Sequence, residues 1–419
     1  MICLLVGTTK YQMESIVTDF TLPEERVAEI VRKCGGDKLQ HCHACDECVA
    51  KCFISHFYPG VDPREIMRKV SAGKIQELVD SDFLWACTLC GECTVDCPKA
   101  LKMDSIIRTL RGICLQQDKA PKRLMEGLQN IKDMGNSVGI DEEEFVDSVK
   151  WLGEETAAEI EGVDEDQFSV PIDKHGAEFL YVPNPREYTS APHMFSVYIG
   201  FLLAIKADWT FASNLRDISN WAYYMGDDET HAMAVRTIVD TARRLGVKTL
   251  VTTECGHGFK IVRKDAEHII GEPLGFNVVS IVELAHDCFR DGRLRLRQGA
   301  IEETVTYHDP CNVGRKVGVY DPPRELLRYV AKKYVDMEPH GKYATCCGGG
   351  GSVAQNTELG QKKLEFGRAK RDQMVATGAT VVATSCQACL AQLNDIQIHY
   401  ELPVKTKTVM ELVMESLAE

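Results

Sequence analysis

The fold is decided by a short stretch that reads CTLCGECTVDCP from Cys87 to Pro98. Its four cysteines are separated by two, two and three residues, and a proline follows the last of them. The same cysteine spacing occurs upstream in the stretch CHACDECVAKCF, from Cys42 to Phe53, where phenylalanine replaces the terminal proline. Two such runs in one chain are typical of ferredoxins that hold two 4Fe–4S clusters.

The spacing also predicts which cysteines share a cluster. In two-cluster ferredoxins, three cysteines of each run hold one cluster and the fourth ligates the other. We therefore expect the first cubane cluster to be held by Cys42, Cys45, Cys48 and Cys97. The second would be held by Cys87, Cys90, Cys93 and Cys52. Zinc is the alternative metal, but zinc sites usually pair two C-x-x-C knuckles across a long loop, which this spacing does not match.

A third cysteine grouping lies in the last third of the chain. It consists of Cys311, the adjacent pair Cys346 and Cys347, and the C-x-x-C pair Cys386 and Cys389. Adjacent cysteines form a disulfide with each other only under strain, so this pair favours metal binding. The four glycines that follow, Gly348–Gly351, let the backbone approach a bulky ligand closely. A phosphate-binding loop is the alternative, but no Lys-Ser/Thr pair follows the glycines.

These groupings make the cysteine content informative. The chain has 419 residues and 18 cysteines, and the three groupings contain thirteen of them. Met1–Gly7 lacks a basic leader, and we expect it to form a buried strand in a cytoplasmic protein whose thiols stay reduced. The remaining cysteines would then be buried apolar side chains, among them Cys3, Cys34, Cys114, Cys255 and Cys288.

The C-terminal grouping resembles the CCG domain of heterodisulfide reductase catalytic subunits. The ferredoxin part resembles the partner subunit of the same enzymes, over the segment from Asp62-Pro63-Arg64 through Ser81–Cys90. A chain that joins the two is similar to the HdrD type and, with one complete CCG motif, to the DsrK and TmcB branch of sulfur-metabolising membrane complexes. The resemblance implies a noncubane 4Fe–4S cluster that acts on disulfides and is held by Cys311, Cys346, Cys347, Cys386 and Cys389.

The second half of the chain contains a pseudo-repeat. Residues 246–255 echo residues 378–386, and Tyr181–Pro185 echoes Tyr307–Cys311. In the earlier copy, Pro185 replaces Cys311, Leu215-Arg216 lie near the place of the vicinal pair, Cys255 is retained and Gly258 replaces Cys389. We therefore expect no noncubane cluster in the first copy.

The fold prediction is a multidomain protein of the α+β and α/β classes. An N-terminal α-helical two-cluster ferredoxin-like domain is followed by a pseudo-duplicated α/β CCG domain. Expected strands are Glu178–Val182, Thr249–Thr252, Thr304–Tyr307 and Thr380–Thr384. The expected parts are an N-terminal extension (1–35), the dicluster domain (36–120), an acidic, solvated helical linker (121–175), the degenerate CCG repeat (176–300) and the complete CCG repeat (301–419).

Charge and hydropathy limit the partners. The net charge of −14 argues against nucleic acid, which requires a basic face. No apolar run reaches the roughly 18–20 residues of a membrane span, so any membrane contact would be peripheral, on the inner face and through other subunits. The resemblance implies a membrane cytochrome b or another quinone-reactive or electron-transfer subunit as partner.

The expected function is that of a heterodisulfide reductase-like oxidoreductase. Electrons would pass through the two cubanes to the CCG cysteines, where a protein or small-molecule disulfide or thiol is reduced or oxidised. His308 and Asp309 adjoin Cys311 and could donate a proton to a leaving thiolate, although a strand-end turn at Pro310 also explains them. Two alternatives stay open: the iron–sulfur subunit of a flavin-dependent glycolate or lactate dehydrogenase, and a pure relay between quinone and soluble carriers.

Overall fold

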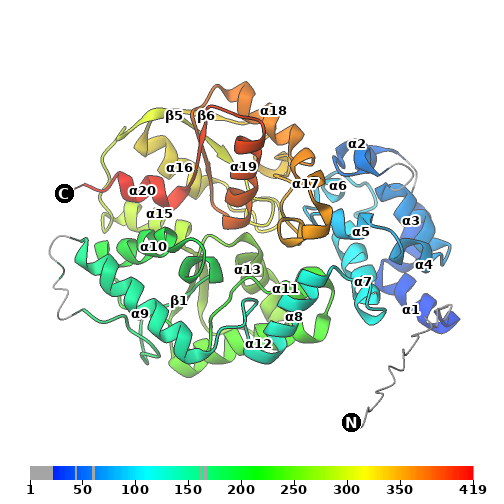
Figure 1. Ribbon diagram of the computed structural model, residues 1–419, viewed down its shortest axis with the longest axis horizontal. Helices are drawn as coiled ribbons and strands as arrows, with labels where there is room; N and C mark the ends of the chain where they lie inside the picture. The colour runs from blue at the N-terminus through cyan, green and yellow to red at the C-terminus, as the bar shows by residue number, and fades with distance from the viewer. Residues whose placement is uncertain (1–21, 43–44, 59–61, 161–162, 164–167, 419) are drawn as a thin grey trace, which may run out of the picture.

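The computed structural model describes residues 22–42, 45–58, 62–160, 163 and 168–418. The strand expected at Met1–Gly7 and the thiol of Cys3 lie outside these residues. Figure 1 shows a helical N-terminal part beside two α/β units, of which the earlier lies below the later in this view.

The regular secondary structure of the N-terminal part, within its described residues, consists of helices joined by turns. Its helices are α1 (Glu24–Lys33), α2 (Glu47–Lys51), α3 (Pro63–Ser71), α4 (Ile75–Val79), α5 (Phe83–Ala86), α6 (Glu92–Val95) and α7 (Met103–Gln116), with 3-10 turns η1 (Gly36–His41) and η2 (Ser55–Phe57). The Asp62 carboxylate caps α3 by accepting from the Glu65 backbone N–H at 2.8 Å, and Pro63 occupies the first turn. Ile106 and Leu110 of α7 are fully buried, so α7 forms the centre of this module.

Two four-stranded parallel sheets make up the rest of the core. The first has the order β2-β1-β3-β4 and the second the order β6-β5-β7-β8. Their strands are β1 (Phe179–Val182), β2 (Trp209–Thr210), β3 (Thr249–Thr252), β4 (Asn277–Ser280), β5 (Ile301–His308), β6 (Ala331–Asp336), β7 (Val381–Thr384) and β8 (Lys405–Thr408). The four strands expected from the sequence are therefore present. Both sheets share one strand order, which an internal repeat requires, while the duplication itself stays a prediction.

Helices connect the parallel strands, as crossover connections require. They are α10 (Pro192–Ala204), α11 (Trp221–Met225), α12 (Asp228–Leu245), α13 (Gly256–Lys260), the π-helical turn η4 (Ile261–Asp265), α14 (Ala266–Ile270), α15 (Ile281–Asp291), α16 (Asp321–Val330), α17 (Lys362–Glu365), α18 (Arg368–Thr377), α19 (Gln387–His399) and α20 (Val409–Glu415). The 3-10 turns are η3 (Pro185–Tyr188), η5 (Gly341–Tyr343), η6 (Val353–Gln355) and η7 (Thr357–Leu359).

The acidic segment expected to be a solvated linker is packed into the structure instead. It forms α8 (Lys122–Met134), which contacts α11, and α9 (Glu142–Ala158), which contacts α10. Phe145, Val149 and Leu152 of α9 are buried because their spacing places them on one helical face. The acidic residues occupy the other face and the capped first turn. The domain boundaries at either end of this segment stay a prediction.

The candidate functional residues lie just after the carboxyl ends of strands. Asn184 follows β1, Cys255 follows β3, Cys311 follows β5 and Cys386 follows β7. Because all strands within each sheet are parallel, their carboxyl ends meet at one edge. Cysteines far apart in sequence are thereby brought to the same edge.

Candidate iron–sulfur centres

The first cavity in the ferredoxin-like part lies between the two cysteine runs. Among its lining residues are Cys42, Cys45, Cys48 and Cys97. Asp46 has a φ of 63°, which places this non-glycine residue in the left-handed region at the start of α2. These four thiols form the donor set expected for the first cubane.

A second cavity lies beside the first. Its lining includes Cys52, Cys87, Cys90 and Cys93, and Cys93 also lines the first cavity. Gly91, with a φ of 73°, makes the corresponding turn at the start of α6. The structure thus brings together the two cysteine sets that crossed ligation requires, and ligation itself stays a prediction.

Burial controls the protonation of these thiols. It raises the pKa of Cys52 to about 12 and that of Cys48 to about 11. Burial also raises the pKa of Cys87 to about 11, against the opposing positive charge of Arg111. Thiols of this kind become thiolates on binding a metal, because the cation compensates the buried negative charge. The two sets therefore fit iron–sulfur clusters in number and in chemistry.

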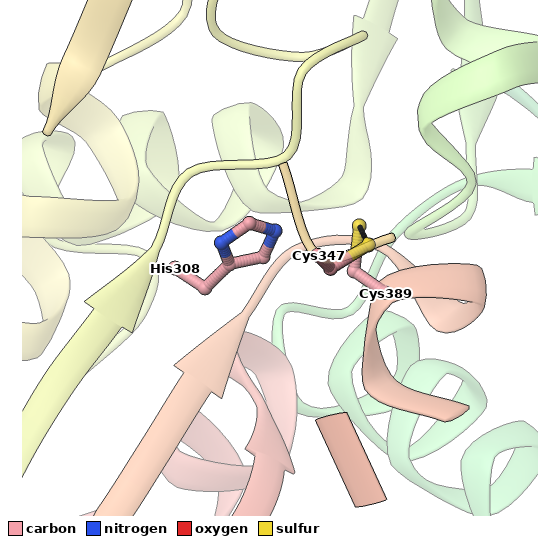
Figure 2. A group of neighbouring side chains, drawn as sticks. All are labelled: His308, Cys347 and Cys389. Carbon is pink, nitrogen blue, oxygen red and sulfur yellow. Dashed lines mark hydrogen bonds between the residues drawn. The ribbon is translucent and has the colours of Figure 1, made fainter. Parts of the chain in front are cut away.

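The five C-terminal cysteines come together in one buried group. The Sγ atoms of Cys347 and Cys389 lie 3.4 Å apart (Figure 2). Cys346 lies near enough to Cys311 and Cys347, and Cys389 near enough to Cys386, for these neighbours to raise the pKa values of Cys346 and Cys389. The expected set of Cys311, Cys346, Cys347, Cys386 and Cys389 is therefore contiguous.

The glycine run supplies N–H groups to this set. The Gly348 N–H points at the Cys346 Sγ at 3.4 Å, and the Gly349 N–H points at the Cys347 Sγ at 3.5 Å. Gly348 has a φ of 92°, which favours glycine. A side chain at Gly349 would collide with Gln392, since an added Cβ would lie 2.7 Å from the Gln392 Cβ. The run is thus required for close approach to the thiols.

Hydrogen bonds shift the pKa values of this set in both directions. The neighbouring thiols of Cys346 and Cys389 lower the pKa of Cys347 well below that of an ordinary thiol. A hydrogen bond from Cys389 lowers the pKa of Cys386 to about 7. Five clustered thiols with a ready-made thiolate fit an iron–sulfur group, and they exceed the four ligands of a zinc site.

His308 belongs to this group, and the sequence left its role open. It ends β5, is buried, and has a ring nitrogen within 4.8 Å of the sulfurs of Cys347 and Cys389 (Figure 2). Neither ring nitrogen has a hydrogen-bond partner among the described residues. Burial lowers the pKa of His308, which favours the neutral ring. The sequence signal for this placement was that His308 follows the expected strand Thr304–Tyr307, whose carboxyl end lies at the same sheet edge as the C-x-x-C pair.

Asp309 has a different role from the one considered for it. Its two carboxylate oxygens each accept from Arg324 at 2.7 Å, and one of them also accepts from the Gly341 N–H at 2.9 Å. Because the carboxylate is fully engaged, Asp309 orders the turn before Cys311 and is not a free proton donor.

The cavity lined by Cys52, Cys87, Cys90 and Cys93 lies against the C-terminal cysteines. The Cys346 thiol donates to the Thr88 hydroxyl at 3.6 Å, and the Cys346 N–H donates to the Glu92 carboxylate at 3.4 Å. Arg315 donates to the carbonyl of Cys90 at 3.0 Å, and Lys316 donates to that of Leu89 at 2.8 Å. The loop of the second ferredoxin run is therefore fixed against the CCG cysteines by residues that follow Cys311.

Arg111 connects the same region through hydrogen bonds to four backbone carbonyls. This fully buried side chain donates to the carbonyls of Leu84 and Cys87 at 2.7 Å, and to those of Tyr224 and Gly351 at 2.8 Å. One guanidinium thus joins the ferredoxin-like part, the first α/β unit and the glycine run. Arg111 and Arg315 carried no sequence signal, since their partners are backbone groups distant in the chain.

The first α/β unit lacks the room as well as the cysteines for such a group. A Cβ on Gly258 would lie 2.4 Å from both the side chain and the backbone oxygen of Ile218, so a cysteine would not fit there. Cys255 is buried, which raises its pKa to about 12, and its Sγ lies 3.6 Å from the Asn184 amide nitrogen. Cys34, Cys114 and Cys288 are buried as expected.

A cavity of about 440 Å³ opens beside the C-terminal cysteines, on the side of the first α/β unit. Gly349 and Ala388, which adjoin Cys347 and Cys389, form its inner wall together with Cys255 and His257. Its mouth includes the exposed side chain of Arg123 on α8. A volume of this size is in the range of small-molecule sites.

Within the described residues, the longest apolar helices are too short or too polar to cross a bilayer.

Protein-family models match the ferredoxin-like part and the part that contains the C-terminal cysteines. The family of 4Fe-4S dicluster domains matches residues 41–102. The family of cysteine-rich CCG domains matches residues 305–394.

Relatives extend over most of the chain. A component of the dihydromethanophenazine:CoB–CoM heterodisulfide reductase of Methanosarcina mazei is 26% identical over 91% of this chain and 94% of its own length. The Hdr-like menaquinol oxidoreductase iron-sulfur subunit of Archaeoglobus profundus is 24% identical over 90% of this chain and 79% of its own. A probable membrane-anchored ferredoxin of Chromohalobacter salexigens is 27% identical over 76% of this chain and 46% of its own.

Proposed function

We propose that this chain passes electrons to a disulfide. The premise is that it joins a 4Fe-4S dicluster domain to a CCG domain and is homologous to a component of heterodisulfide reductase. At the coarser level it is an iron–sulfur electron-transfer protein of the Hdr-like oxidoreductases. The finer assignments are the crossed cubane ligands, a noncubane cluster on the five C-terminal cysteines and a disulfide or persulfide substrate.

The contact of Cys346 with the second ferredoxin loop carries this proposal. The Cys346 thiol donates to the Thr88 hydroxyl at 3.6 Å, and the Cys346 N–H donates to the Glu92 carboxylate at 3.4 Å, so the CCG set touches the loop of the second cubane set. Cys93 lines both cubane cavities, so the three cysteine groups form one continuous series. When bound, the clusters would supply one-electron redox centres and an iron able to take sulfur. The chain's part is to hold them side by side, which the bonds from Arg315 and Arg111 achieve.

The cavity beside Gly349 and Ala388 supports a substrate site. Reduction of a disulfide requires two electrons and two protons and yields two thiols, so the substrate must approach the cysteines that adjoin this cavity. Gly349 and Ala388 present no large side chain between the cavity and Cys347 or Cys389. Arg186 and His257 line the same space and would orient a polar or anionic end of the substrate.

His308 is placed to assist beside the thiols. Its ring is desolvated and faces Cys347 and Cys389, with no other partner among the described residues. We assign it to proton delivery to the departing thiolate or to ligation of the iron. Retained iron with lost turnover in His308→Phe supports the first assignment, and lost iron supports the second.

A relay without disulfide chemistry is the second candidate. It is favoured by the similarity to an iron-sulfur protein of a menaquinol oxidoreductase, whose name describes transfer from a quinol. In both cases we propose a membrane cytochrome b or another quinone-reactive subunit as partner, with this chain peripheral on the cytoplasmic face of the membrane. The position within the DsrK and TmcB branch is part of this proposal.

The test is turnover by the anaerobically purified chain. Reduced viologen would serve as donor, and cystine, an organic trisulfide and a protein disulfide as separate substrates. We expect substrate-dependent viologen oxidation that is lost in Cys347→Ser and retained in Cys288→Ser, which is also buried but lies outside the five-cysteine set and outside the cavity. Absence of turnover with every substrate, together with oxidation of a quinol analogue, would favour the relay.

A further inference from the structure

A second and larger cavity lies on another face of the molecule, with a volume of about 980 Å³. Gly91, Thr94 and Val95 line it, and these residues belong to the loop that contains Cys90, Cys93 and Cys97. Its walls come from α7, α12, η4 and α14, and from the segment after Cys311. The groove therefore leads from solvent to the cysteine loop shared by both cubane sets, away from the proposed substrate cavity.

Every aspartate in this groove is neutralised by a neighbouring base. Asp104 pairs with Lys316 at 3.0 Å, Asp228 pairs with Arg108 at 2.8 Å, and Asp265 pairs with Lys260. The acidic groups therefore contribute little net negative charge to the groove.

Three further lysines have no such partner. Lys102 precedes α7, Lys264 lies on η4 and Lys342 lies on η5, and all three are exposed without an ion pair among the described residues. The groove has seven lysine and arginine residues against three aspartates, in a chain whose net charge is −14. It is a basic groove on an acidic protein, and it lies over the cysteine loop.

We infer that this groove docks an acidic, soluble one-electron carrier protein that exchanges electrons with the cubane held by Cys52, Cys87, Cys90 and Cys93. The inference rests on the proposed function, since it needs a redox centre behind Gly91. The free lysines come from three separate segments around a wide, open groove, which suits the broad face of a protein better than a single small anion. One electron moves from the reduced carrier to the oxidised centre, and no bond is made or broken.

The test compares two charge-reversal variants of the full chain. The first carries Lys102→Glu, Lys264→Glu and Lys342→Glu. The control carries Lys150→Glu, Lys248→Glu and Lys333→Glu, which are equally exposed and equally free of ion pairs among the described residues but lie outside the groove. The probe is an acidic bacterial two-cluster ferredoxin, used oxidised for calorimetric binding and reduced for stopped-flow electron transfer.

We expect the groove variant to bind ferredoxin at least about tenfold more weakly at low ionic strength, with a matching fall in the second-order rate. The wild-type rate should fall as ionic strength rises from about 0.01 to about 0.15 M, where the Debye length shortens from about 30 to about 8 Å. The control variant should keep both values within about twofold of the wild type.

Equal behaviour of the two variants would overturn the docking site. Photoreduction with a deazaflavin separates this outcome from failure of the proposed function, because it reduces the clusters without a protein carrier. Clusters that accept electrons from the deazaflavin, while ferredoxin fails to distinguish the variants, would refute the groove alone. Clusters that accept no electrons from either source would refute the proposed function.

Discussion

At the residue scale, the turn before Cys311 depends on one buried ion pair. The side chains of Asp309 and Arg324 are only 2% and 6% exposed, and they form two parallel hydrogen bonds. Asp336 accepts from the Nε of Arg324 at 2.8 Å and would remain if Asp309 were changed. Buried pairs of this geometry are costly to break, because the remaining charge has no solvent to compensate it.

We predict that Asp309→Asn lowers the free energy of unfolding by about 2–3 kcal/mol, because Arg324 loses its strongest partner while Asp336 stays. Glu302→Gln is the control. It removes a carboxylate from an ion pair with Lys332 whose side chains are 72% and 56% exposed, so we expect less than about 1 kcal/mol. Denaturant titration of both variants, at equal iron content, measures the difference. Shifts of equal size would show that the buried pair has no special role.

At the scale of elements, the glycine run joins two centres. Gly351 has a φ of 57°, and a Cβ there would lie 2.6 Å from the carbonyl carbon of Thr88 and 2.9 Å from the oxygen of Cys87. Its own carbonyl accepts from Arg111. The run therefore holds the CCG thiols on one side and the second ferredoxin loop on the other.

We predict that Gly351→Ala slows electron transfer from the cubanes to the CCG centre, because the added methyl group pushes the two loops apart. Gly378→Ala also lies at a positive φ, 63°, at the end of α18, but no atom lies within 4 Å of its Cβ. It should cost only about 1 kcal/mol of backbone strain and leave transfer unchanged. Rapid-freeze spectroscopy after photoreduction measures the transfer. Equal rates in the two variants would contradict the role of the contact.

Local patterns predicted most of these elements and the cysteine groups. The spacing of Cys87–Pro98 predicted the second cavity, and the short β-rich runs predicted β1, β3, β5 and β7. The helical packing of 142–158 was missed, because its apolar residues are few and their common face is visible only against α10. Arg111, Arg315 and the contact of Cys346 with the second ferredoxin loop were beyond prediction from one sequence, since each depends on how separately folded parts meet.

At the scale of the whole molecule, buried acids lie between the two α/β units. Glu187, from the first unit, accepts from the side-chain amide of Gln387 in the second at 2.7 Å and from the Tyr181 hydroxyl at 2.7 Å. Burial raises the pKa of Glu187 from the ordinary 4.5 to about 7. Glu254 accepts from the Val409 N–H, and burial raises its pKa as well. The junction therefore favours protonated acids.

We predict that Glu187 contributes less to stability as pH rises from about 5 to about 7. Between pH 4.5 and 7 the folded state binds the Glu187 proton more tightly than the unfolded state, so raising the pH through this window removes up to about 3 kcal/mol of stabilisation by this group. His231 and His257, whose pKa values burial lowers to about 4, act in the opposite direction, so the effect is measured as a difference between variants. Relative to the wild type, Glu187→Gln should gain stability as the pH rises through this window, whereas the exposed Glu142→Gln should keep a constant difference. Thermal unfolding across this pH range measures it. A constant difference between Glu187→Gln and the wild type would contradict this role of Glu187.

The assembly as a whole is a series of three cysteine groups held against one another. The shared wall at Cys93 and the contacts of Cys346 with Thr88 and Glu92 bring the groups together, while the proposed substrate cavity and the basic groove have no lining residue in common. This separation suits a protein that receives electrons at one cavity and uses them at another.

The most direct test of this account is the iron and acid-labile sulfide content of the anaerobically isolated chain. Three 4Fe–4S clusters predict about twelve irons per polypeptide. Cys347→Ser should retain about eight, and Cys255→Ser should retain about twelve, with the cubane signals unchanged in both. Zinc in place of iron, or about eight irons in the wild type, would contradict a third cluster on Cys311, Cys346, Cys347, Cys386 and Cys389.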